Sequence, residues 1–189
     1  MHGGWWRSLD PSSFSHLAAG ANAQGVSVAV AGYDLCPQVS IAQIVEQMRA
    51  ACLYLWRKRK QRIMVSGHSA GGHLTACMVA TDWKALDPGV PADLVPAGYS
   101  ISGVFDLTPL TQISINQDLR AVVGGDESSE FLRQSKTIAE AWRQGMVETR
   151  YEAVPGANHF TVIEPLGQGD SAMTACVVEL AKKVQAEQL

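Results

Sequence analysis

Apolar residues recur at intervals of three and four along parts of the chain. From Ile41 onward they stand at positions 41, 44, 45, 48, 52 and 55, which is one face of a helix. Ser40, directly before this stretch, is a suitable N-cap. A helix of small residues is predicted over 70–81, and two further helices are predicted over 131–146 and 171–188.

Short apolar runs precede and separate these helices. They predict strands over residues 26–31, 62–67, 97–103, 121–124 and 147–154. The β-branched run Val26–Ala31 is typical of a strand that is buried on both faces. Strands that alternate with helices predict an α/β fold, with a mostly parallel sheet between two layers of helices. At ~150 residues per domain, the length of 189 residues predicts a single domain over 1–189.

Composition excludes several classes of function. Hydrophobic residues make up 47% of the chain and charged residues 17%, so the chain can bury a core. A formal charge of −3 is a poor match for nucleic acid, because binding to phosphates is dominated by basic side chains. No run approaches the ~20 apolar residues of a membrane span, and residues 1–4 do not resemble the start of a signal peptide. We therefore expect neither a nucleic-acid partner nor a membrane partner.

Cysteine usage points to a reducing compartment. The four cysteines, at positions 36, 52, 77 and 176, are widely spaced and form no C-x-x-C, so we expect reduced thiols in a cytoplasmic protein. The sequence also lacks metal-ligand spacing and glycine-rich phosphate loops, so we expect no metal and no cofactor. It leaves the oligomeric state open, with a homodimer among the options.

The strongest chemical motif is Gly67-His68-Ser69-Ala70-Gly71, a G-x-S-x-G. It follows a predicted strand and opens a predicted helix, which is the context that a nucleophile elbow requires. The two glycines let neighbouring backbone pass closely in the tight turn. This arrangement predicts Ser69 as a nucleophile at the carboxyl end of the sheet.

A serine hydroxyl is a weak nucleophile and needs a base. After such an elbow the acid comes next along the chain and the histidine last. His159 lies in a loop after the last predicted strand, whereas His73 lies one turn into the helix and points away from the serine. We therefore predict His159 as the general base.

The acid should lie between Ser69 and His159, at the end of a strand. Asp126 follows the predicted strand 121–124 and is favoured. Asp106 also ends a predicted strand and is the main rival, and Glu127 beside Asp126 is a weaker one. The acid would hold the histidine in the correct tautomer and stabilise the imidazolium.

Acyl transfer also needs donors for the oxyanion. One predicted donor is the backbone N–H of Ala70, the residue after the nucleophile. The others are the N–H groups of Gly4 and Trp5, in the segment that opens the chain, and the N–H of Gly3 is the next candidate. His2 is expected to have a structural role.

Several motifs together resemble a known family. The motifs are His2-Gly3-Gly4-Trp5-Trp6, Tyr33-Asp34-Leu35-Cys36-Pro37, Gly67 to Leu74, Ser102 to Leu107, Gly124 to Glu127 and Asn158-His159-Phe160. They resemble the α/β-hydrolase fold, and within it the arylformamidase (kynurenine formamidase) branch near the hormone-sensitive-lipase-like esterases. The resemblance covers nearly the whole chain.

The resemblance implies a serine hydrolase that converts N-formylkynurenine to kynurenine and formate, and that also cleaves small aryl or short acyl esters. It implies the triad Ser69, Asp126 and His159. Trp5, Trp6 and Phe160 are expected to line a pocket for an aryl group, with ordinary core packing as the alternative. A generalist carboxylesterase or thioesterase, and a catalytically silent binding module, are the competing functions.

The chain also departs from that family at three places. The family has one or two strands before His-Gly-Gly that are absent here. This chain is several residues shorter between Trp56 and Arg62, and lacks on the order of twenty residues between Arg120 and Ala121, normally loop and the start of a strand. We expect these departures to affect the substrate pocket more than the triad.

Overall fold

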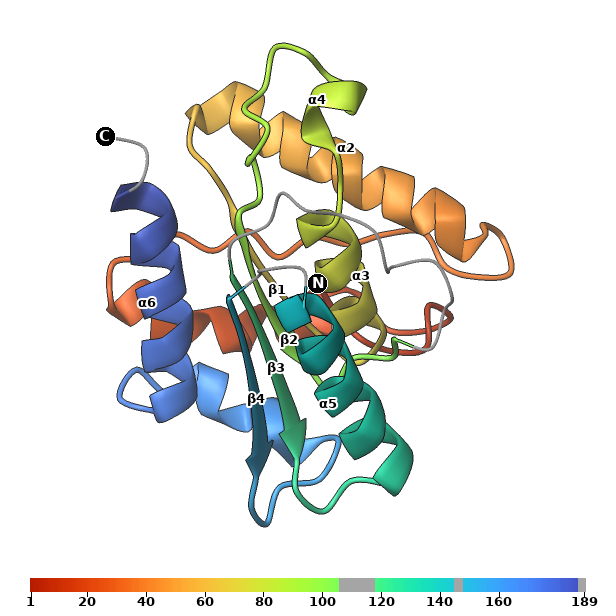
Figure 1. Cartoon of the computed structure of the whole chain (residues 1–189), viewed down its shortest axis with the longest axis vertical. Helices are drawn as coiled ribbons and strands as arrows, with labels where there is room; N and C mark the ends of the chain where they lie inside the picture. Colours follow the sequence, from red (N-terminus) through yellow and green to blue (C-terminus); the bar gives the residue numbers. More distant parts are fainter. Residues whose placement is uncertain (106–117, 145–147, 187–189) are drawn as a thin grey trace.

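A sheet of parallel strands organises the computed structural model of the chain, which describes residues 1–105, 118–144 and 148–186. In these residues the sheet has four strands, β1 (Met64–His68), β2 (Ala97–Ile101), β3 (Asp118–Gly124) and β4 (Glu148–Val154), in the order β1-β2-β3-β4. Every neighbouring pair is parallel, so the carboxyl ends of the strands lie along one edge of the sheet (Figure 1). The predicted parallel sheet is confirmed.

One face of this sheet is covered by helices α2 (Ile41–Arg59), α3 (Ala70–Val79) and α5 (Ser129–Gln144), with the short α4 (Trp83–Leu86) beside them. Helix α2 begins where the sequence predicts, because the Ser40 hydroxyl accepts the Gln43 N–H in a capping box. Its buried residues Ile44, Met48 and Cys52 pack against α3. The apolar spacing of this helix therefore faces the core as expected.

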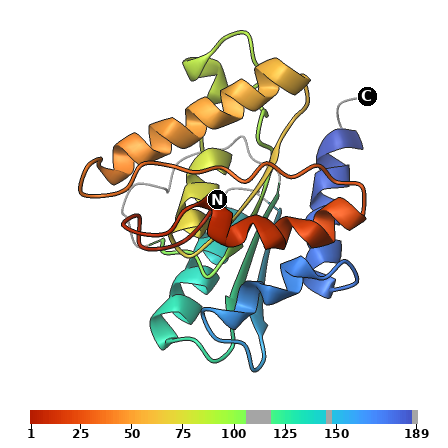
Figure 2. The ribbon, with the colours of Figure 1, turned by 180° about the vertical axis from the view of Figure 1, so that it is seen from behind.

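The other face is covered by η1 (Pro11–Ala18), α1 (Ala19–Ala23), η2 (Thr161–Gly167) and α6 (Ala172–Ala186). Figure 2 shows the N-terminal helical segment, in red, in front of the strands and α6, in blue, to their right. Tyr99 and Ile101 of β2 are buried there against Leu180 and Val184 of α6. With helices on both faces, the molecule has the expected three α/β/α layers. Among the described helices, none combines the length and the apolar character that crossing a membrane requires.

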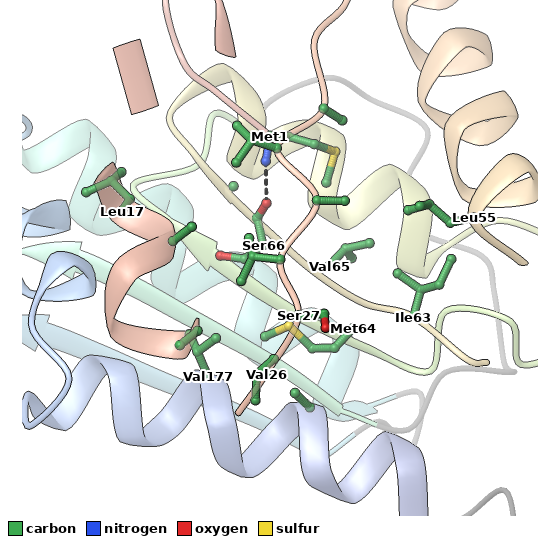
Figure 3. Close-up of a pocket in the computed structure, with 18 of the residues that line it drawn as sticks. Met1, Leu17, Val26, Ser27, Leu55, Ile63, Met64, Val65, Ser66 and Val177 are labelled. Carbon is green, nitrogen blue, oxygen red and sulfur yellow. Dashed lines mark hydrogen bonds between the residues drawn. The ribbon is translucent and has the colours of Figure 1, made fainter. Parts of the chain in front are cut away.

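The strand predicted over Val26–Ala31 is wrong. In the described chain this segment pairs with no strand, and all of its residues are exposed or half-buried. A cavity of about 530 Å³ separates it from the edge of β1 (Figure 3). At one end of that cavity the Met1 nitrogen donates to the carbonyl oxygen of Ser66 at 2.7 Å. Without a neighbouring backbone the segment cannot form a ladder, whatever its residues favour.

The other element boundaries differ from prediction by a few residues. The strand predicted over 97–103 ends at Ile101, because Ser102 takes a left-handed φ of 48° and turns the chain out of the sheet. The strand predicted over 121–124 starts earlier, at Asp118. The last helix spans Ala172–Ala186, within the predicted range.

Candidate active site

The segment after β1 forms the sharp turn that the motif predicts. Ser69 links β1 to α3 with φ 56° and ψ −119°, a conformation that side-chain-bearing residues rarely adopt. A Cβ on Gly67 would lie 2.1 Å from the Gly71 carbonyl oxygen, and a Cβ on Gly71 would lie 2.2 Å from the Met1 carbonyl oxygen. Both positions therefore require glycine, and the turn presents the serine at the carboxyl edge of the sheet.

His159 reaches Ser69 from the loop that follows β4. Its Nε2 lies 3.0 Å from the Ser69 Oγ, within hydrogen-bond distance. The loop is held by Asn158, whose Oδ1 accepts the N–H groups of Phe160 and Thr161. The structure thus brings together the two residues that the sequence pairs as nucleophile and base.

The carboxylate beside His159 belongs to Glu127, not to Asp126. The Glu127 Oε2 lies 2.7 Å from the His159 Nδ1, and the Glu127 side chain is only 1% exposed. Its Oε1 accepts the Gly124 N–H at 2.8 Å and the Ser102 hydroxyl. The three hydrogen-bonding partners of this carboxylate come from the end of β3 and from the loops after β2 and β4.

The prediction that Asp126 is the acid beside His159 is corrected, because the turn after β3 directs its side chain away from that histidine. The Glu127 N–H donates to the Gly124 carbonyl oxygen, and the Asp126 N–H donates to the Ala157 carbonyl oxygen. These bonds turn the Asp126 side chain to the surface, where it is exposed, and the next side chain inward. The rival Asp106 lies outside the described residues.

Electrostatics keep this acid ionised. Burial by itself would raise the pKa of the Glu127 carboxyl, but hydrogen bonds from His159, Ser102 and the Gly124 amide outweigh it. The net result is a pKa below the usual value for glutamate. An ionised acceptor at the His159 Nδ1 leaves Nε2 free to take the proton of Ser69.

The segment that opens the chain lies against the nucleophile. A Cβ on Gly3 would lie 3.0 Å from the Ser69 Cβ, so only glycine fits there without displacement. Gly4, Trp5 and Trp6 have φ values of 104°, 55° and 57°, a left-handed run that bends the backbone around the site. The predicted N–H donors of Gly3, Gly4 and Trp5 thus belong to a loop beside Ser69, and their oxyanion role stays a prediction.

The Ala70 N–H and the packing of His2 both bear on the predicted oxyanion donors. The Ala70 N–H is the first of helix α3, where backbone donors have no partner within the helix. His2 is buried, stacks on the Tyr33 ring with centroids 4.2 Å apart, and its carbonyl oxygen accepts the Tyr33 hydroxyl. This packing fits the structural role expected of His2, since it holds the loop in place.

Only some of the predicted pocket aromatics lie by the site. Phe160 packs edgewise on the His159 ring, with centroids 5.7 Å apart, and is exposed, as is Trp5. Trp6 is buried and packs edgewise on His73 with centroids 5.3 Å apart, so it belongs to the core and not to a substrate surface. Phe131, which the sequence did not single out, lies 4.5 Å from His159 between ring centroids.

Sequence reasoning also missed Ser102 as a partner of the acid. It follows β2 directly, and its position at a strand end was the available signal. In the parts of the chain that the structure describes, no three His, Cys, Asp or Glu side chains gather as a metal site would need.

Comparison with known proteins identifies the family to which this chain belongs. Residues 1–118 match a family described by its alpha/beta hydrolase fold. The chain belongs to the α/β-hydrolase family. This α/β hydrolase is 26% identical to a kynurenine formamidase of Salmo salar over 215 aligned positions, which cover 97% of this chain and 72% of the relative. It is 24% identical to a kynurenine formamidase of Danio rerio, with the same two coverages. The resemblance stated from the sequence motifs is confirmed.

Solved structures show the same fold. A crystal structure from Silicibacter sp., described as that of "a putative thioesterase", is 32% identical with a TM-score of 0.77, and the match covers 93% of this chain and 73% of that one. An esterase of Pyrobaculum calidifontis is 17% identical with a TM-score of 0.75, over 99% and 75% of the two chains. The family and the kynurenine formamidase relatives together identify the chain as a hydrolase.

Proposed function

We propose that this α/β hydrolase is a serine hydrolase that cleaves small aryl formamides or short-chain esters through an acyl-enzyme. The observation that carries the proposal is the chain of hydrogen bonds from Ser69 through His159 to Glu127, at 3.0 and 2.7 Å. Nucleophile, base and buried acid in this order define the arrangement of a catalytic triad. The proposed acid is Glu127 in place of Asp126.

The first half of the reaction forms the acyl-enzyme. The His159 Nε2 takes the proton of the Ser69 hydroxyl while Oγ bonds to the carbonyl carbon of the substrate. The oxyanion that results accepts the N–H of Ala70 and one from the loop Gly3–Trp5. His159 then gives its proton to the leaving nitrogen or oxygen as the bond to carbon breaks, and Glu127 stabilises the imidazolium in between.

The second half releases the acid product. A water molecule gives a proton to the His159 Nε2 and attacks the acyl carbon of the enzyme ester. The tetrahedral intermediate collapses, Ser69 recovers its proton, and a carboxylic acid leaves. With a formamide substrate this acid is formate and the first product is an aryl amine.

The choice of N-formylkynurenine as substrate rests on relatives and on aromatic side chains. The kynurenine formamidases of two fishes cover nearly this whole chain. Phe131 and Phe160 place aromatic surface beside His159, on which an aryl leaving group can pack, and Trp5 exposes a further aromatic side chain on the loop beside Ser69. The 32% identical Silicibacter structure favours a thioesterase or generalist carboxylesterase as the second candidate.

The test uses paired substrates and one nucleophile variant. We expect the protein to hydrolyse N-formyl-L-kynurenine and p-nitrophenyl acetate, and a fluorophosphonate probe to label Ser69. Ser69→Ala should lower kcat by roughly 10⁴–10⁶-fold, whereas Ser15→Ala, at an exposed position in η1, should not. A Ser69→Ala variant that keeps more than a tenth of the activity removes Ser69 from the mechanism.

The ratio of kcat/KM for the two substrates separates the candidates. A ratio that strongly favours p-nitrophenyl acetate or a short acyl thioester over the formamide would replace the formamidase by the generalist esterase or thioesterase. The absence of both hydrolysis and labelling would favour the silent binding module. The location in the cytoplasm, the homodimer and the lack of a cofactor stay predictions.

A further inference from the structure

His68, the second residue of the G-x-S-x-G motif, touches both loops that surround the nucleophile. Its ring is buried at the end of β1 and lies 4.7 Å from the His159 ring between centroids. On another side, a Cβ on Gly3 would lie only 3.3 Å from the His68 Nδ1. The mechanism above gives this buried imidazole no part.

A hydrogen bond ties His68 to the backbone of the proposed base. The His68 Nε2 lies 2.7 Å from the His159 carbonyl oxygen. A carbonyl oxygen only accepts, so Nε2 carries the proton and donates. This contact joins residues 91 positions apart in the chain, and it holds the loop after β4 to the end of β1.

The contact matters because the base must stay close to the nucleophile. His159 comes from a loop, and its Nε2 must remain near 3.0 Å from the Ser69 Oγ. A misplacement of about 1 Å can lower a reaction rate by about 10²-fold. His68 lies on strand β1, and its hydrogen bond to the His159 carbonyl oxygen limits such misplacement.

We propose that His68 is a positioning residue for His159. It donates to the His159 carbonyl oxygen and packs on its ring, and so holds the base over Ser69 at the distance that proton transfer needs. The inference rests on the proposed function, because it assigns His159 the role of base. It goes beyond that function by adding a residue that acts through His159 and transfers no proton itself.

The charge state of His68 fits this role. Burial, with a smaller contribution from the neighbouring His159 ring, lowers the pKa of its imidazole to about 4. His68 is therefore neutral near pH 7, where it keeps one N–H to donate. A neutral ring also adds no positive charge beside the imidazolium that forms on His159 during the reaction.

His73 provides a matched control, because it is also buried and burial lowers its pKa to about 4 as well. It lies five residues further along and packs on Trp6, and among the described residues it makes no hydrogen bond or ring contact with His159. Replacing His73 therefore measures the effect of losing a buried histidine on stability, while the contacts of His159 are kept.

The experiment compares His68→Leu, His68→Gln and His73→Leu. The side chain in His68→Leu has no hydrogen-bond donor, whereas the side chain in His68→Gln can place an N–H near the position of the His68 Nε2. For each variant we would measure the melting temperature, kcat and KM with p-nitrophenyl acetate, the labelling rate with a fluorophosphonate, and the imidazole NMR signals of His159.

We expect His68→Leu to lower kcat and the labelling rate by about 10²-fold with little change in KM. His68→Gln should restore most of the loss, and His73→Leu should lower only the melting temperature. The His159 signals should shift in His68→Leu and return in His68→Gln. The proposal is overturned if folded His68→Leu retains the wild-type kcat, or if the glutamine fails to restore activity while leaving the melting temperature intact.

Failure of the proposed function gives a different result. In that case the wild-type protein neither hydrolyses the substrates nor reacts with the fluorophosphonate. The NMR signals then decide the role of His68 alone: a shift in His68→Leu that reverses in His68→Gln supports it, and unchanged His159 signals overturn it.

Discussion

Replacing Glu127 by glutamine is the sharpest test of the corrected triad. Glutamine has nearly the same shape, so the hydrogen bonds from Ser102 and the Gly124 amide can persist. The change removes the negative charge that lies 2.7 Å from the His159 Nδ1. It also allows the side-chain amide to donate to Nδ1, which would leave the proton on Nε2, the atom that should accept from Ser69.

The magnitude follows from the charge and its surroundings. Two unit charges about 4 Å apart in an effective dielectric of about 20 attract by about 4 kcal/mol, which corresponds to about 10³-fold in rate. The wrong tautomer adds to this loss, and a comparable substitution in a serine protease lowers kcat by about 10⁴-fold. We therefore expect Glu127→Gln to lower kcat by about 10³–10⁴-fold.

The assay is kcat with p-nitrophenyl acetate at pH 7.5, with melting temperatures recorded for each variant. Asp126→Asn is the matched control, because it changes the adjacent exposed carboxylate by the same chemistry. It should retain activity within about threefold, as surface substitutions usually have small effects. Asp106→Asn completes the set. If Asp126→Asn or Asp106→Asn loses more activity than Glu127→Gln at equal stability, the hydrogen bond to His159 does not mark the catalytic acid.

Three further predictions concern stability and specificity. Burial lowers the pKa of His68 and of His73 to about 4, so the unfolded chain binds more protons between about pH 6.5 and 4. The free energy of unfolding, measured with urea, should fall as the pH falls through this window, by up to about 3 kcal/mol per histidine, and a flat profile would contradict the burial. Gly67→Ala should reduce soluble yield and melting temperature sharply, because its methyl group would lie 2.1 Å from the Gly71 carbonyl oxygen, and a wild-type melting curve would refute this. The bulky Trp5 in the loop beside Ser69 should narrow the acyl side of the pocket, so we expect kcat/KM to fall by about 10–200-fold from acetyl to hexanoyl esters and Trp5→Gly to relax that preference. Equal turnover of both esters by the wild-type protein would contradict a narrow acyl pocket.

Local patterns predicted what local geometry decides. The apolar spacing and the Ser40 cap located helix α2, and the glycines around Ser69 located the elbow, because each signal acts within a few residues. His159 was found because the chain order of such triads restricts the choice to the last loop. In each case the determining contacts are close in sequence or follow from the strand order of a parallel sheet.

The errors arise where distant contacts decide. Asp126 and Glu127 follow the same strand, and only the hydrogen bond from the Asp126 N–H to Ala157 shows which side chain turns inward. The segment Val26–Ala31 has the composition of a buried strand, but a strand also needs a paired backbone, and none lies beside it in the described residues. Trp6 is in a loop, where no periodicity separates a core residue from a pocket residue.

The left-handed backbone around the nucleophile has a consequence for how this protein can be improved. Ser69, Ser102, Trp5 and Trp6 all have φ values between 48° and 57°, and each such residue costs about 1–3 kcal/mol. Their sum is a sizeable share of the ~5–15 kcal/mol by which domains are stable. A screen that selects for heat resistance alone will therefore favour glycine at these positions and relax the geometry that holds the site. Directed evolution of this enzyme should select for activity and thermostability together, and should seek stabilising changes on the outer helices.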